Sequence, residues 1–158
     1  MPEQNPEIIE ALANNEEKLS KLYGLFAANY KEYYNFWSGL SNDELVHAAW
    51  LRELNKSFRI GSLRVDESKF HPEAVKLFSD YIGQKISGAQ AGGLPMEKAL
   101  YIALDLEEAL IEKKWFTMFE PTSVKDDLIL EKLIKTLQTH REQVAGMINE
   151  YLKTNKEF

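Results

Sequence analysis

The fold is decided by residues 16–51, which read EEKLSKLYGLFAANYKEYYNFWSGLSNDELVHAAWL. Apolar residues recur there three and four positions apart, first as far as Tyr30 and again from Trp37, with the polar run KEYYN between them. This spacing is typical of two amphipathic helices joined by a short turn. The stretch therefore predicts an antiparallel hairpin with helices over about Pro6–Tyr30 and Tyr34–Phe58.

A second pair of helices is predicted after a longer connection. The periodicity favours helices over Pro95–Phe119 and from about Asp126 to Leu152, joined by a few residues around EPTSVK. The connection between the two hairpins, about residues 59–94, contains an amphipathic piece at Pro72–Ile86 and then the helix breaker SGAQAGG. Short, long and short connections are typical of a four-helix bundle made of two hairpins and one crossover. Because no alternating strand pattern occurs, we expect a single all-α domain over residues 1–158.

Composition narrows the classes of function. The chain has 25 acidic and 19 basic residues, a formal net charge of −6 and no clustered basic face, which argues against a nucleic-acid partner. It has no cysteine, so any transition metal would have to be held by histidines and carboxylates. The polar N-terminus is unlike a signal peptide, and no apolar run reaches about 18 residues, so we expect a cytoplasmic protein without a membrane span.

Two histidines lie on the inward stripes of the predicted helices. Glu44 and His47 stand three positions apart in DELVHAAW, which places both on one side of a helix. His140 holds the equivalent place in the last helix, but Leu137 stands where a matching Glu would be. Ionisable side chains are rarely buried unless they are paired or bound to a metal. The pattern therefore indicates a polar or metal-binding layer inside the bundle.

The first and third predicted helices add carboxylates at the same depth. Helical angles favour Glu16 over Glu17 and Glu108 over Glu107, with Glu112 about 40° from Glu108 at ~100° per residue. Each group lies about 14 to 15 residues from its predicted turn, roughly 22 Å along the helix. All four helices can therefore contribute to one layer.

Two segments resemble rubrerythrin-like proteins of the ferritin-like superfamily. Residues 16–51 are similar to the first hairpin of that family, and ALYIALDLEEALIEKKWFTMF at 99–119 is similar to its third helix. The resemblance covers nearly the whole chain and implies a ferritin-like four-helix bundle with a non-haem di-iron site that reacts with peroxide or oxygen. The metal ligands that it implies are Glu16, Glu44, His47, Glu108 and His140, with Glu112 as a candidate for the missing carboxylate.

Two departures from the family leave the function open. Leu137 removes a bridging or terminal carboxylate, and the chain has no cysteine for the rubredoxin-type iron domain of true rubrerythrins. Three hypotheses follow: a di-iron oxidoreductase, a weaker single-metal site holding iron, manganese or zinc, and a metal-free bundle with a binding or structural role. The family type is compatible with a homodimer. No catalytic residue is assigned, and Tyr23 is interpreted as a core aromatic beside the layer.

Overall fold

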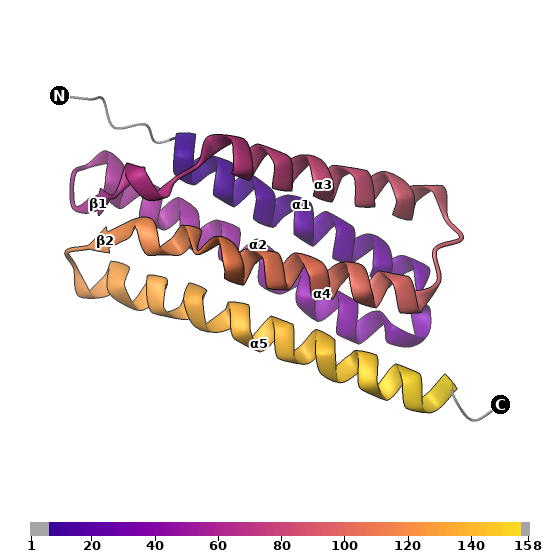
Figure 1. The fold of residues 1–158 in the computed structure, drawn as a ribbon. Helices are drawn as coiled ribbons and strands as arrows, with labels where there is room; N and C mark the ends of the chain where they lie inside the picture. The colour runs from indigo at the N-terminus through magenta and orange to yellow at the C-terminus, as the bar shows by residue number, and fades with distance from the viewer. Residues whose placement is uncertain (1–6, 156–158) are drawn as a thin grey trace.

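The computed structural model describes residues 7–155, which are mainly helical (Figure 1). Three short 3-10 helices accompany the α-helices: η1 (Lys31–Tyr33), η2 (Glu67–Lys69) and η3 (Trp115–Met118). The prediction of an all-α chain is confirmed, while the predicted helix start at Pro6 lies outside the described residues. The described part contains five α-helices: α1 (Glu7–Asn29), α2 (Tyr34–Arg59), α3 (Pro72–Ala91), α4 (Met96–Lys113) and α5 (Val124–Asn155).

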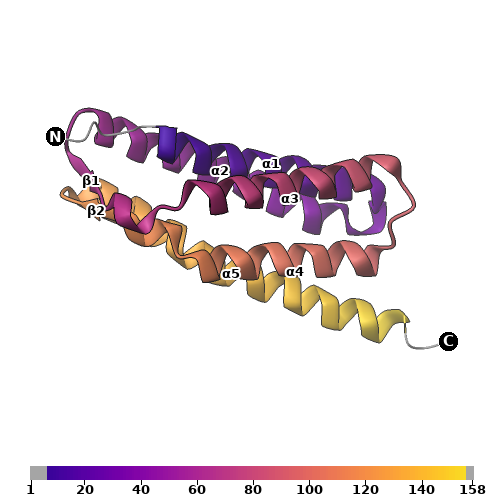
Figure 2. The same ribbon diagram turned by 45° about the horizontal axis from the view of Figure 1, so that its top comes forward.

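The helices lie side by side and alternate in direction (Figures 1 and 2). Helices α1, α3 and α5 run one way, and α2 and α4 run the other way. Helix α3 returns the chain along α1, so that α4 starts at the end of the molecule where α2 also starts. Helix α1 packs on α2, α4 packs on α5, and α2 contacts α5. The four helices predicted from the sequence thus form two hairpins linked by a crossover helix.

The crossover helix is longer than the sequence predicts. Helix α3 continues past Ile86 through most of the expected breaker and ends only at Gly92, whose φ of 80° is left-handed. One stripe of α3 is buried against α1, and the Asn29 side-chain amide donates to the Ala89 carbonyl at 3.2 Å. Packing against α1 therefore overrides the low helix propensity of the SGAQA segment, and only the glycine pair stops the helix.

Helix α4 is shorter than the sequence predicts. It ends at Lys113, because Lys114 adopts a left-handed conformation with φ of 54°, and the chain then forms η3 and the strand β2 (Phe119–Pro121). This strand pairs antiparallel with β1 (Leu63–Val65) at one end of the bundle. The expectation of helix up to Phe119 and of no strands is therefore wrong here. Strands of three residues are too short to show an alternating pattern in the sequence.

Aromatic packing near the α1–α2 turn holds the first hairpin together. Tyr23, Phe26 and Trp37 are fully buried, and the Phe26 and Trp37 rings meet edge to face with centroids 4.8 Å apart. The Ser41 hydroxyl also donates to the Ser20 carbonyl at 2.8 Å. These contacts set the register of α2 against α1 and so determine which residues of the two helices lie at the same level.

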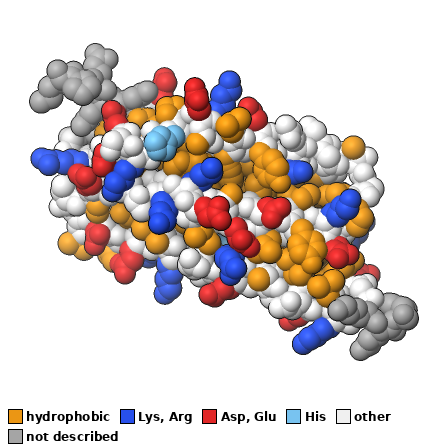
Figure 3. Space-filling model, viewed as in Figure 1, with side chains coloured by type: hydrophobic (Ala, Val, Ile, Leu, Met, Phe, Trp, Pro, Cys, Tyr) orange, Lys and Arg blue, Asp and Glu red, His pale blue; other side chains and the backbone are white. Residues whose placement is uncertain are grey.

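The surface carries mixed charge. On the face shown in Figure 3, acidic and basic side chains are interspersed between patches of hydrophobic residues. Within residues 7–155, no helix combines the length and the apolar character needed to cross a bilayer.

Candidate metal centre

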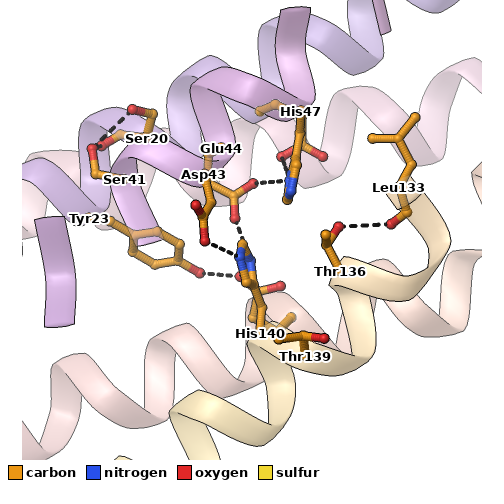
Figure 4. Close-up of polar contacts among 12 residues, drawn as sticks. Ser20, Tyr23, Ser41, Asp43, Glu44, His47, Leu133, Thr136, Thr139 and His140 are labelled. Atoms are coloured by element: carbon orange, nitrogen blue, oxygen red, sulfur yellow. Dashed lines mark hydrogen bonds and ion pairs between the residues drawn. The ribbon is translucent and has the colours of Figure 1, made fainter. Parts of the chain in front are cut away.

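Five ionisable side chains form a buried layer in the middle of the bundle, and Figure 4 shows Glu44, His47 and His140 of this layer. None is more than 3% exposed, and four helices contribute them. The layer brings together four residues singled out from the sequence and one alternate: Glu16 from α1, Glu44 and His47 from α2, Glu107 from α4 and His140 from α5.

Glu44 stands between the two histidines. Its Oε2 lies 3.3 Å from His47 Nδ1, and its Oε1 lies 2.9 Å from His140 Nδ1. Glu16 Oε2 lies 3.8 Å from His47 Nδ1, and Glu107 Oε1 lies 3.6 Å from His140 Nδ1. Each imidazole thus presents Nδ1 to the shared carboxylate and to one further carboxylate, in a nearly two-fold arrangement.

The register of α4 differs from the one preferred from the sequence. Glu107 is fully buried, whereas Glu108 is 42% exposed and lies 3.9 Å from Arg141 Nε. Glu112 is exposed on the same side of the bundle and also stays out of the layer. The reason is that the buried face of α4 runs through Ala99, Ala103 and Leu110, about one residue before the stripe through Leu104 and Ile111 that would have turned Glu108 inward.

The preference for Glu16 over Glu17 on the first helix agrees with the structure. Glu16 faces inward, whereas Glu17 forms an ion pair with Arg52 at the surface. Leu137 is half-buried and lines a cavity of about 120 Å³ together with Ile111 and Trp115. This turn of α5 therefore contributes no carboxylate to the layer.

Two further side chains orient members of the layer. His140 Nε2 donates to Asp43 Oδ2 at 3.0 Å, which turns Nδ1 of the same ring toward Glu44. A carboxylate on the distal nitrogen is how metal-binding imidazoles are commonly oriented. The Tyr23 hydroxyl donates to Glu107 Oε1 at 2.9 Å. Asp43 was not predicted as a site residue, because its partner His140 lies 97 positions away in the chain. The one local signal is its place directly before Glu44.

Burial and mutual contacts shift the pKa values of the layer. Burial, reinforced by the charge of Glu44, raises the pKa of Glu16 and of Glu107. Burial alone would lower the histidine pKa values, but carboxylate contacts raise the pKa of His47 to about 10 and that of His140 to about 11. Burial opposes ionisation of Glu44 as well, yet its contacts with Glu16 and both imidazoles lower its pKa. Without metal, the layer therefore holds protons on both imidazoles around an anionic Glu44.

Several carboxylate oxygens in the layer lack hydrogen-bond partners. Glu16 Oε2, both oxygens of Glu44 and Glu107 Oε2 are buried and accept no hydrogen bond, although the Glu44 oxygens lie within ion-pair distance of His47 Nδ1, at 3.3 Å, and of His140 Nδ1, at 2.9 Å. Leaving a buried polar atom unpaired costs about 1–3 kcal/mol, and more for a charged one. A cation bound by these oxygens would remove that cost.

One set of donor atoms is close enough to share an ion. The ligand atoms of Glu44, His47 and His140 lie within 4.8 Å of one another. Imidazole nitrogen and carboxylate oxygen are donors that suit zinc, iron and manganese. The geometry therefore allows these three residues to hold a metal ion, with Glu16 and Glu107 beside it.

Comparison with known proteins identifies no relative. No protein-family model, no curated protein and no solved structure matches the chain. The resemblance to rubrerythrin-like proteins thus rests on the residues themselves.

Proposed function

We propose that this chain is a non-haem metal protein of the rubrerythrin-like, ferritin-like type, with its metal bound in the buried layer. One observation carries the proposal: four carboxylate oxygens of the layer are buried without a hydrogen bond, and the two that belong to Glu44 lie 3.3 Å and 2.9 Å from the Nδ1 atoms of His47 and His140. A buried network that served only as polar packing would be expected to pair its oxygens, because unpaired buried polar groups are rare in native proteins. A cation is the partner that suits this set.

The donor set favours one tightly bound ion over two equal ones. Glu44 is the one carboxylate of the layer that approaches both imidazoles; Glu16 adjoins His47, and Glu107 adjoins His140. Two dications about 3.5–4 Å apart need anionic groups that bridge them. Because Leu137 supplies no second bridge, we infer a tight first ion at Glu44, His47 and His140. A second ion would bind more weakly.

We propose iron as the ion, with peroxide or oxygen as the reactant. Bound iron would supply one-electron redox chemistry, as in the di-iron carboxylate proteins of this bundle type. Residues around the layer orient its ligands and shield them from water. Asp43 orients His140, Tyr23 orients Glu107, and burial of all five side chains keeps bulk water away from them. Binding must displace the protons held at Nδ1 of the two imidazoles, since the nitrogens bind metal only when deprotonated.

The first experiment measures metal content and affinity. Protein produced in iron-supplemented cells should contain about one tightly held metal ion per chain by elemental analysis, and the metal-free chain should bind Co²⁺ with similar stoichiometry. Oxidation of the ferrous protein by peroxide should then change its near-ultraviolet absorption. Glu44→Gln should abolish both results, and Glu108→Gln is the matched control, because it removes the same charge from the surface of α4.

Two outcomes would separate the hypotheses. Negligible metal after purification together with no Co²⁺ binding would overturn the proposal and favour the metal-free bundle. Two equally tight ions would contradict the inference of a single strong position, and would show that the layer functions with one bridging carboxylate.

A further inference from the structure

A groove lies between α2 and α5, and its lining ends at Asp43, next to the buried layer. Its volume is about 400 Å³, and the charged residues that line it are Asp43, Glu142 and Glu150, with no Lys or Arg among its lining residues. The neighbouring groove between α4 and α5 is lined by Glu108 and Glu112 but also by Arg141, which lies 3.9 Å from Glu108. The charged residues of the groove between α2 and α5 are thus all acidic, and its remaining side chains are the apolar Phe36, Leu40 and Met147 and the amides Asn35 and Gln143.

Asp43 links this groove to the layer. Its side chain is 52% exposed, yet its Oδ2 lies 3.0 Å from Nε2 of the buried His140. On the other side of the same ring, Nδ1 lies 2.9 Å from Oε1 of the buried Glu44. One imidazole ring therefore separates a solvent-accessible carboxylate from the shared carboxylate of the layer.

Two glycines in the middle of the helices keep the groove open. Gly39 of α2 and Gly146 of α5 both line it, and a Cβ added at either position would meet no atom within 4 Å. Glycine in a helix interior lowers stability relative to alanine. No close packing requires it at these two positions, and its structural consequence is an unobstructed groove.

We propose that the groove between α2 and α5 is the route by which divalent cations reach the buried centre, with Asp43 at its inner end. This inference rests on the proposed metal-binding function and adds the path to it. Carboxylates lining a concave surface concentrate cations and raise their association rate. Glu142 and Glu150 supply that field, and Asp43 is exposed to an ion in the groove while it contacts His140.

The first test measures the rate at which metal-free protein takes up Co²⁺, using stopped-flow absorption. It compares two double variants. Glu142→Gln with Glu150→Gln should slow uptake about three- to tenfold at low salt, because both removed charges lie along the route. Glu108→Gln with Glu112→Gln removes equal charge from the neighbouring groove and should change the rate by less than about twofold. Neither pair belongs to the buried layer, so the final Co²⁺ content should stay unchanged.

The second test blocks the groove without changing its charge. Gly146→Leu should slow Co²⁺ uptake at both low and high salt, and it should fold well because leucine has the higher helix propensity. Gly88→Leu is the control, since Gly88 is also an exposed helix glycine with free space around it but lies on α3.

Three results would be decisive. Slower uptake in the groove variants alone supports the route. Equal rates in all variants, with normal final Co²⁺ content, would overturn the route and leave the proposed function standing. Absence of Co²⁺ binding in the unaltered chain would overturn the proposed function, and this route with it.

Discussion

The two hairpins contribute unequally to the buried layer. Hairpin α1–α2 supplies Glu16, Glu44 and His47, whereas hairpin α4–α5 supplies Glu107 and His140 and has the half-buried Leu137 three residues before its histidine. Only the first hairpin provides a carboxylate that reaches both imidazoles. The comparison shows that the two hairpins bring a histidine to the same layer with unequal numbers of carboxylates, because Leu137 occupies the position three residues before His140.

The hairpins also differ in how regular they are. Helices α1 and α2 are joined by one short 3-10 helix, and the aromatic cluster of Tyr23, Phe26 and Trp37 packs beside this turn. Helix α4 is instead followed by η3 and β2 before α5 begins. The strand pair β1–β2 then ties the end of α4 to the end of α2. The second hairpin is thus positioned by contacts with the first.

The largest effect is expected from removing the shared carboxylate. Glu44→Gln should weaken Co²⁺ binding by more than about 100-fold, because even residues outside the ligand set commonly cost 10- to 100-fold in metal affinity. Isothermal titration of the metal-free variant measures the loss. Unchanged affinity would show that the Glu44 carboxylate is not a ligand of the ion.

The next largest effect should come from the contact between the hairpins at His140. Asp43→Ala should weaken Co²⁺ binding by about 10- to 100-fold, since the ring loses the group that orients it. Asp43→Asn keeps an acceptor for Nε2–H, so its Co²⁺ affinity should lie between that of Asp43→Ala and that of the unaltered chain. NMR of the His140 ring in the metal-free variants separates orientation from a general loss of stability, because the ring nitrogen signals report the loss of the acceptor at Nε2. Unchanged ring signals and affinity would contradict the positioning role.

Metal affinity should rise with pH. The pKa values of His47 and His140 in the metal-free chain, about 10 and 11, leave both rings protonated at neutral pH. Each proton displaced on binding should strengthen Co²⁺ affinity about tenfold per pH unit below those values. Titrations between pH 6 and 8 in buffers of different ionisation enthalpy measure the number of protons released.

The folding stability of the metal-free chain should depend on pH in the opposite direction and fall as the pH rises. Because both histidine pKa values are raised above the unfolded value of about 6.5, the stabilisation that they provide is complete below that pH. It is lost as the pH rises through about 10 and 11. Urea unfolding should therefore show falling stability above neutrality, and His47→Ala should flatten this dependence. Stability that rises with alkaline pH would contradict the assigned protonation states.

The smallest effect is expected from restoring the second carboxylate. Leu137→Glu should strengthen binding of a second Co²⁺ by about tenfold or less, because an added anionic bridge offsets the repulsion between two dications. The cavity of about 120 Å³ beside Leu137 gives the new side chain room. Leu133→Glu is a useful contrast, since Leu133 is fully buried in the core and its replacement should reduce stability without adding a second ion. A second ion that binds no better in Leu137→Glu would show that the asymmetry of the hairpins has another cause.

The sequence by itself determined the helical class, the two hairpins and most of the layer. Strong three- and four-residue periodicity assigned Glu16 rather than Glu17 to the inward face and placed Glu44, His47 and His140 on inward stripes at matching depths. This worked because each of those helices has one clearly apolar side.

Only the tertiary structure decided the remaining parts. Apolar residues surround much of α4, so its rotation depends on how Ala99 and Ala103 pack and could not be read from periodicity; this rotation selects Glu107 over Glu108. The extension of α3, the end of α4 at Lys114 and the contact between Asp43 and His140 likewise depend on neighbouring helices. Local sequence encodes the face that a helix buries, but contacts between helices fix its exact rotation and the partners of its polar residues.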